Sequence, residues 1–144
     1  MPSRLNLNDA RTWAIRGWIT LMCDEPEQAI ESFERSLVLN PMDPRRGTSW
    51  MGIAFAYFLL GNHDKGAALA EKSVELAAEA HSLSILIGHE VRAGRLADAR
   101  RHAVRLMNIQ PGFRASHSQD VFPIRSPEFH RHLIDALREA GVPE

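Results

Sequence analysis

The sequence predicts an all-α fold in which about three helical hairpins stack into a solenoid and a C-terminal capping helix closes the stack. A five-residue pattern, Leu-Asn-x-x-Asp, occurs at residues 5–9 and again at residues 39–43, an offset of 34 residues. A fixed period of about 20–50 residues indicates stacked supersecondary units. The segments between the Gly and Pro turn signals are rich in Ala, Leu, Glu and Arg, which favour the helix. The repeated unit is therefore expected to be helical.

Composition is that of an ordinary soluble domain and argues against several partner classes. The 144 residues suit a single domain, 1–144, and 44% hydrophobic with 24% charged residues is a usual balance. A formal net charge of -1 gives no argument for nucleic acid or an anionic membrane. No apolar run approaches the roughly 20 residues that span a bilayer. The N-terminus lacks the apolar core of a secretory signal, and the single Cys23 excludes an intramolecular disulfide. We expect a cytoplasmic chain with no nucleic-acid and no membrane partner.

The first hairpin is predicted at about 10–43, where small and aromatic residues recur. Spacings of 4, 12, 4 and 8 residues separate Trp13, Gly17, Ala29, Phe33 and Pro41. Small side chains let the two helices of a hairpin approach closely. Phe33 and Leu37 continue the face of Ala29 at i+4 and i+8, which gives the second helix one apolar stripe.

Local signals predict where these helices begin and end. The first helix is expected to begin near Asn8 or Asp9, capped by that polar side chain. Asp24 is expected to cap the second helix, whose first turn holds Pro26. Two prolines that follow Asn40 are expected to stop that helix.

Two further hairpins follow when the turns between helices are aligned. Asp24, Gly61 and Gly94 occupy equivalent places, 37 and 33 residues apart. On this register the second hairpin covers about 47–80 and the third about 80–113.

This pattern resembles the tetratricopeptide repeat (TPR), a helix–turn–helix unit of about 34 residues. Trp50 of the second unit matches Trp13, whereas Gly66 stands where the first unit has Ala29. The resemblance implies that the first helix of each unit lines a concave groove that contacts a protein or peptide. The Lys and Asn side chains with which the family clamps C-terminal carboxylates are absent here. Those places hold Ala14, Met51 and Ser84, and then Trp18, Phe55 and Gly88.

The same register predicts one continuous apolar concavity as the partner-binding groove. Its expected lining residues are Trp18, Leu21, Met51, Phe55 and Phe58. An apolar surface of this extent is expected to be covered. Three covers are open: a partner segment, a second copy of the chain, or the chain's own stretch at 121–124.

Residues 114–144 are predicted to form a C-terminal extension ending in a capping helix. Ser126 is expected to cap this helix, with Pro127 in its first turn. Phe129, Leu133 and Leu137 form one apolar stripe. We expect the stripe to cover the open face of the last hairpin, as the end of a solenoid requires.

A narrower resemblance concerns the two ends of the chain. The segments "IQPGF", "FPIRSPEF" and "LIDALREAGVPE" resemble the end of the TPR region in bacterial class III adenylate cyclases. This implies a noncatalytic regulatory end of a larger signalling protein. Separately, the 34-residue offset predicts that residues 1–9, one period before 39–43, are the remnant of an earlier repeat; the alternative is a short natural N-terminal arm.

No constellation for chemistry is found, so no catalytic, cofactor or metal site is expected. Glu128 and His132 lie one helical turn apart but lack a third ligand, and Cys23 lacks a His–acid partner. No Gly-rich phosphate loop follows a strand. The chain should therefore neither bind ATP nor make cyclic AMP.

The leading prediction is a noncatalytic protein-interaction module. The first alternative is a scaffold that acts by self-association as a homodimer, and an enzyme or metal-binding protein is the third. Charge separates along the chain: residues 24 to 35 hold five acids and one Arg, whereas five arginines lie within 92–105. Such charges are either solvated helix faces or a head-to-tail contact between copies.

Overall fold

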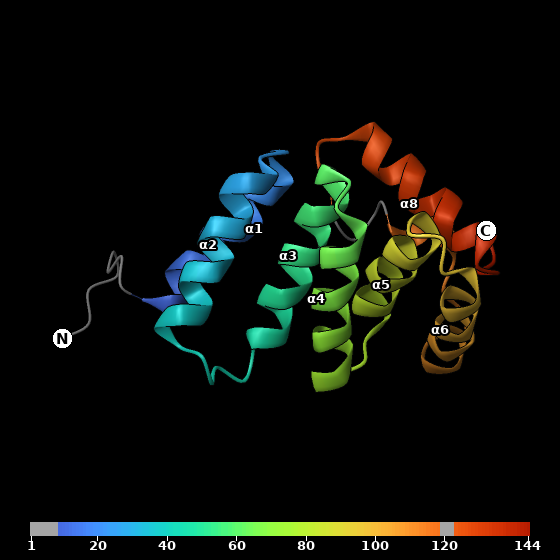
Figure 1. Cartoon of the computed structure of the whole chain (residues 1–144), viewed down its shortest axis with the longest axis horizontal. Helices are drawn as coiled ribbons and strands as arrows, with labels where there is room; N and C mark the ends of the chain where they lie inside the picture. Colours follow the sequence, from blue (N-terminus) through green and yellow to red (C-terminus); the bar gives the residue numbers. More distant parts are fainter. Residues whose placement is uncertain (1–8, 119–122) are drawn as a thin grey trace.

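The computed structural model describes residues 9–118 and 123–144, and within these ranges it is helical without a β-strand (Figure 1). The all-α prediction is confirmed. The helices are α1 (Ala10–Met22), α2 (Pro26–Leu39), α3 (Arg46–Leu60), α4 (His63–Leu76), α5 (Ala80–Arg92), α6 (Leu96–Ile109), the 3-10 turn η1 (Ala115–His117) and α8 (Pro127–Glu139). None of these helices is both long and apolar enough to cross a bilayer.

Two of the predicted helix starts are confirmed. The Asp9 carboxylate accepts a hydrogen bond from the Arg11 backbone N–H at 3.0 Å, so it caps α1. The Ser126 hydroxyl accepts one from the Phe129 N–H at 3.2 Å, which caps α8. Both satisfy an N–H group that the first helical turn leaves without a partner.

The prediction that Asp24 caps α2 is wrong. The residue before α2 is Glu25, which makes no side-chain capping bond, and Asp24 has a left-handed backbone with φ 61°. Gly61 and Gly94 have φ values of 76° and 81° at the two equivalent turns. Asp is one of the few residues besides glycine that adopts this conformation. Asp24 therefore closes the turn after α1 and does not start α2.

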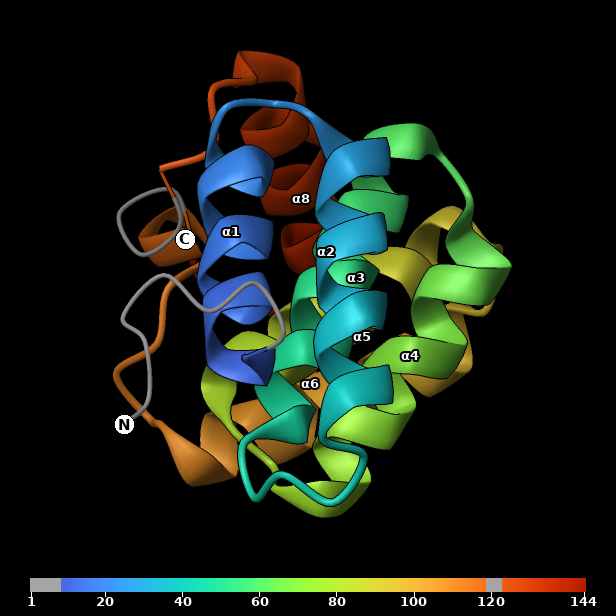
Figure 2. The same cartoon turned by 90° about the vertical axis from the view of Figure 1, so that its left-hand side faces the viewer.

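Consecutive helices pack against one another throughout α1 to α6, with the tightest contact between α1 and α2. Phe33 of α2 is fully buried, and its ring lies against the backbone of Gly17. A Cβ at Gly17 would come within 2.7 Å of that ring, so a larger residue would push α1 away from α2. Figure 2, seen from the α1–α2 end, shows these two helices side by side.

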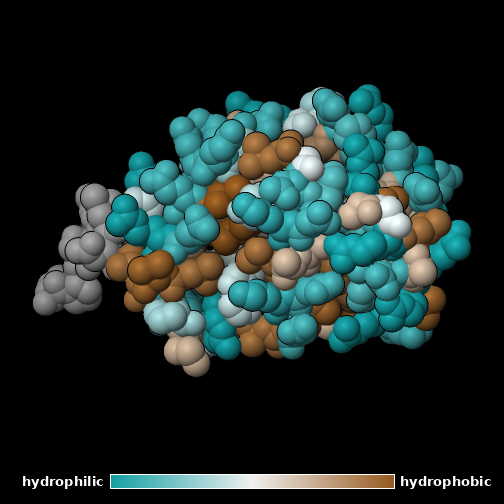
Figure 3. Space-filling view, in the orientation of Figure 1, coloured by the Kyte–Doolittle hydropathy of each residue, from teal (hydrophilic) through white to brown (hydrophobic). Residues whose placement is uncertain are grey.

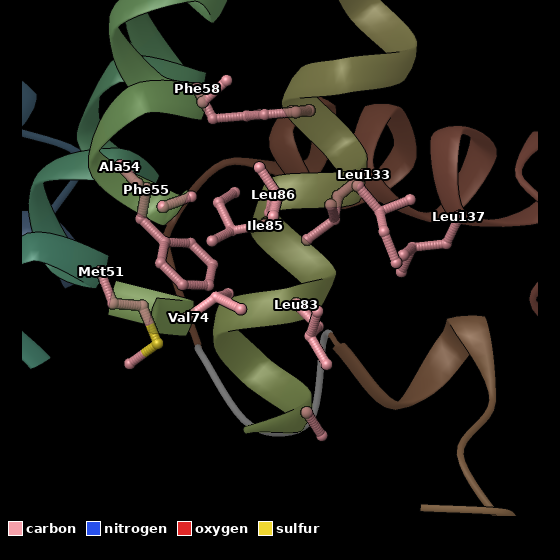
Figure 4. Close-up of a cluster of buried hydrophobic side chains, with 14 of the residues drawn as sticks. Met51, Ala54, Phe55, Phe58, Val74, Leu83, Ile85, Leu86, Leu133 and Leu137 are labelled. Atoms are coloured by element: carbon pink, nitrogen blue, oxygen red, sulfur yellow. The ribbon is translucent and has the colours of Figure 1, made fainter. Parts of the chain in front are cut away.

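Helix α5 is the centre of the fold. It contacts α3, α4, α6 and α8, and every residue from Ser82 to Glu90 is buried. Figure 4 shows Phe58 reaching from α3 toward α5, and Leu133 projecting from α8 toward the same helix. A helix that is apolar on most sides is expected in such an interior position.

The C-terminal helix packs on the last hairpin, as predicted, and it does so through α5, the first helix of that hairpin. Helix α8 packs mainly on α5 and η1, running obliquely to the other helices at their upper ends in Figure 1. It does not cover the outer side of α6, where Val104 remains 64% exposed. The apolar stripe of α8 is instead buried against the side formed by α1, α3 and α5, which we call the first-helix side. An amphipathic stripe specifies that a face is buried, but not which surface buries it.

Candidate interaction surface

The five groove residues predicted from the sequence belong to one hydrophobic cluster. Leu21, Met51, Phe55 and Phe58 are buried, and Trp18 is half-buried and packs against the same cluster. Other side chains of the same chain bury the first four of these residues. Of the stretch predicted as the cover, Ile124 is buried, whereas residues 121 and 122 lie outside the described ranges.

Helix α8 covers two of these residues, Phe55 and Phe58. The Phe129 ring lies 5.8 Å from the Phe55 ring and 5.5 Å from the Phe58 ring, centroid to centroid. Gly88 of α5 makes room for Leu133, because a Cβ at position 88 would come within 2.7 Å of the Leu133 side chain. We call the surface formed by Phe55, Phe58 and Gly88 the α8 seat. The seat is the apolar part of the first-helix side that α8 occupies.

A second part of the first-helix side is open. Between α1 and the start of α3 lies a cavity of about 240 Å³, which we call the α1 groove. Its lining residues are Arg11, Ala14, Ile15, Trp18, Ser36, Asp43, Arg45, Thr48 and Ser49. Ile15 is 51% exposed, and Ile19, one turn further along α1, is 59% exposed. The α1 groove thus combines exposed apolar side chains with two guanidinium groups.

The face of the molecule seen in Figure 3 is mostly hydrophilic. Hydrophobic side chains lie at the α1–α2 end and in smaller groups across the rest of this face. The acidic side chains of α2 and the arginines of α6 that were noted in the sequence are mostly exposed. They are accessible to solvent in a single copy of the chain.

A buried histidine joins three helices, and the sequence analysis missed it. His89 of α5 is fully buried, with Nε2 2.7 Å from the Ala54 carbonyl oxygen of α3. Because a carbonyl only accepts, Nε2 carries the proton, and Nδ1 then accepts from Nδ1 of His63 at 3.0 Å. Gly66 of α4 makes room for the ring. Burial, and to a lesser degree the nearby His63, lower the pKa of His89 to about 4.

The next residue joins α5 to the last helix of the stack. Glu90 is buried, and its carboxylate lies 2.7 Å from Nδ1 of His102 on α6. The hydrogen bond from His102 to Glu90 raises the pKa of this histidine. The hydrogen bond from His102 satisfies the buried carboxylate oxygen, which would otherwise be costly to bury.

We expect the free energy of unfolding to fall as the pH is lowered from about 6.5 to 4. His89 stays neutral when folded but takes up a proton below pH 6.5 when unfolded, so its lowered pKa stabilises the fold only at higher pH. This difference corresponds to about 3 kcal/mol. His63 and His81, whose pKa values burial also lowers, act in the same direction. His102 acts oppositely: its contribution is complete at low pH and is lost as the pH rises through its raised pKa.

Urea unfolding at pH 7 and at pH 4.5 measures this effect, with His89→Gln as the matched variant. An amide at position 89 can donate to the Ala54 carbonyl but does not titrate. The variant is expected to lose less stability between the two pH values than the unchanged chain. Equal losses of stability in the two proteins would show that His89 does not cause the decrease between pH 7 and pH 4.5.

No metal-binding group is found among the titratable side chains that the structure describes. Within residues 9–118 and 123–144, no three His, Cys, Asp or Glu side chains form a metal-binding group. His132 and Glu128, a pair considered from the sequence, lie 3.8 Å apart on the surface of α8. His130 donates from Nε2 to the Ile124 carbonyl at 2.9 Å and so fixes the entry to α8.

Comparison with known proteins identifies the fold and no family. No protein-family model and no curated protein matches the chain. Among solved structures, the chain is similar to the second TPR domain of human RPAP3, determined in complex with the HSP70 peptide SGPTIEEVD. The TM-score is 0.66 at 13% identity, over 90% of this chain and 98% of that one. The chain therefore has a TPR-type fold. These comparisons do not confirm the resemblance to bacterial cyclases.

Proposed function

We propose that the chain is a noncatalytic interaction module that binds a peptide or protein segment in the α1 groove. The observation that carries this proposal is the exposure of Ile15 and Ile19 beside an open cavity, on the side of a TPR-type fold formed by its first helices. The RPAP3 domain of the same fold was solved with a bound peptide. Covering two half-exposed isoleucines would contribute roughly 1–2 kcal/mol each to binding.

Of the five residues predicted for the groove, Trp18 keeps its proposed role directly. It lines the open cavity together with Ile15. Leu21, Met51, Phe55 and Phe58 are covered in this structure, so a partner reaches the last two only where α8 has moved. Their proposed role in binding is therefore conditional on the movement of α8.

Finer parts of the proposal rest on the sequence alone. These are the repeat limits 10–43, 47–80 and 80–113, the bacterial cyclase-like parent protein and the cytoplasmic setting. Self-association as a homodimer is the alternative function, and the exposed Val38 of α2 and Val104 of α6 favour it. Sedimentation equilibrium distinguishes this alternative from the peptide-binding module. A chain that is monomeric at micromolar concentration contradicts the homodimer.

The α1 groove is tested with peptides selected for binding from a random library. Ile15→Glu is expected to lower the affinity for a selected peptide by about tenfold or more, because a carboxylate replaces apolar contact area. The melting temperature should change little, since the side chain is half-exposed in the free chain. Fluorescence anisotropy measures the affinity, and circular dichroism measures the melting.

The matched control is Val38→Glu, which changes another exposed aliphatic residue, 77% exposed, on α2. It lies outside the α1 groove and should leave peptide affinity unchanged. If Ile15→Glu binds selected peptides as well as the unchanged chain does, the groove is not the binding surface.

A further inference from the structure

The attachment of α8 to the rest of the fold is almost wholly apolar. Its side chains form hydrogen bonds and ion pairs only within the tail, among the residues that the structure describes. Examples are His132 with Glu128, and Arg138 with Asp135 and with Glu144 at 2.6 Å. Among the residues that the structure describes, two backbone bonds hold the ends of the segment that carries α8. One runs from Arg125 N–H to the Met22 carbonyl of α1 at 3.0 Å, and the other from Ala115 N–H of η1 to the Pro143 carbonyl at 2.7 Å. Specific polar contacts do not select α8 over another helix.

The α8 seat is shaped for an amphipathic helix with large apolar residues four positions apart. Phe129 packs against both Phe55 and Phe58, and Leu133, one turn later, fills the space above Gly88. Leu137 continues the same stripe and is fully buried. The features that the seat recognises are this stripe and the absence of a side chain at Gly88. A helix from elsewhere can supply the same stripe.

Helix α8 leaves part of the first-helix side uncovered. Its main neighbours are α5 and η1, whereas Ile15 and Ile19 of α1 stay exposed. A longer helix could occupy the seat and also cover α1, and would then bury apolar surface that α8 does not reach. A competitor displaces a tethered segment only through such additional interaction free energy.

We propose that α8 is a displaceable occupant of its seat, and that an amphipathic helix of a partner protein takes its place. This inference rests on the proposed function of the chain as a protein-interaction module. The partner helix would carry aromatic or aliphatic residues at i, i+4 and i+8, with further apolar residues that reach Ile15 and Ile19. A second copy of the chain is the weaker candidate. Its α8 has the same stripe and offers no additional contact, while each copy already holds its own α8 covalently.

The test uses the full chain and, as a probe, a fluorescent peptide with the sequence of residues 126–144. Leu133→Ala in the chain weakens the docking of its own α8 and leaves the seat on α3 and α5 unchanged. The peptide is expected to bind this variant at least about tenfold more tightly than the unchanged chain. Arg131→Ala, an exposed change in the same helix, is the matched control and should not tighten binding.

Four results of this test would overturn the proposal. One is failure of the peptide to bind the Leu133→Ala chain, and another is equal tightening by Arg131→Ala. The third is loss of helix well beyond the 13 residues of α8 in the Leu133→Ala chain, since α8 would then be an inseparable part of the core. A concentration-dependent dimer that forms through exchanged α8 helices would replace the partner helix with a second copy, and would also overturn it.

Hydrogen exchange on the unchanged chain gives an independent readout. A displaceable α8 opens without global unfolding, so its amides should exchange faster than those of α5. Equal protection of the two helices would contradict the proposal. These outcomes are separate from the test of the α1 groove: Ile15→Glu leaves the contacts of α8 intact, so either result can fail without the other.

Discussion

The substitution Phe55→Asp is expected to unfold the chain rather than to disturb only its binding. Phe55 is 1% exposed, lies within the main hydrophobic cluster and packs against Phe129. Loss of a buried aromatic side chain costs about 3–5 kcal/mol. An ionised carboxylate in the same place adds a burial penalty of several kcal/mol. The sum is comparable to the total stability of a small domain, about 5–15 kcal/mol. Most of the helical circular dichroism should be lost at 25 °C.

The matched variant Phe55→Leu separates charge burial from loss of the ring. This variant keeps an apolar side chain at the buried position. The protein should stay folded, with a lower urea concentration at the midpoint of unfolding. A Phe55→Asp chain that melts like the unchanged protein would show that Phe55 reaches water when no partner is bound. In that case the groove predicted from the sequence would be open in solution, and partner binding should be the property that suffers.

The helices could be predicted well because their signals are local. Trp13, Phe33 and the small residues between them recur at fixed spacings, and Ser126 followed by Pro127 marks the start of α8. Each of these signals acts within a few residues of its own position. The error at Asp24 has the same origin: aspartate is favoured both as a helix cap and in a left-handed turn. Its alignment with Gly61 and Gly94 favours the turn.

The destination of α8 could not be predicted, because it depends on contacts far apart in the sequence. The stripe of Phe129 and Leu133 shows that one face is buried. It does not distinguish the outer side of α6 from the seat on α3 and α5. At that seat the missing side chain of Gly88 leaves space for Leu133. The sequence analysis noted Gly88 only as the place of an absent clamp residue. Consequently four groove residues predicted to meet a partner are buried by the chain's own tail and neighbouring helices.

The buried His89 was missed for a related reason. The sequence has seven histidines, and spacing along the chain does not show which of them has space to be buried. Gly66 departs from the alanine that the first hairpin has at the equivalent position, Ala29. That departure was treated as loss of regularity in the repeat. In the structure, the missing side chain of Gly66 leaves the space that the His89 ring occupies.

Gly66→Ala is therefore expected to destabilise the fold, although alanine favours the helix more than glycine does. In an unhindered helix the change would stabilise by about 1 kcal/mol. Here a Cβ at position 66 would overlap the His89 ring, 2.6 Å from Nδ1 and closer to Cε1 and Nε2. The ring would have to leave its hydrogen bonds to Ala54 and His63. Overpacking together with these lost bonds gives an expected cost of about 2–4 kcal/mol, measured by urea unfolding at pH 7.

A double-mutant cycle with His89→Ala shows whether the ring is the cause. Removing the ring empties the space beside α4, so Gly66→Ala in that background should be neutral or should stabilise by up to about 1 kcal/mol. The coupling free energy between the two changes is then several kcal/mol. The double variant should lose less stability than the sum of the losses in the two single variants. If Gly66→Ala costs the same with and without the ring, α4 and α5 pack differently from this structure. A glycine in the middle of a helix would then need another explanation than the histidine that lies against it.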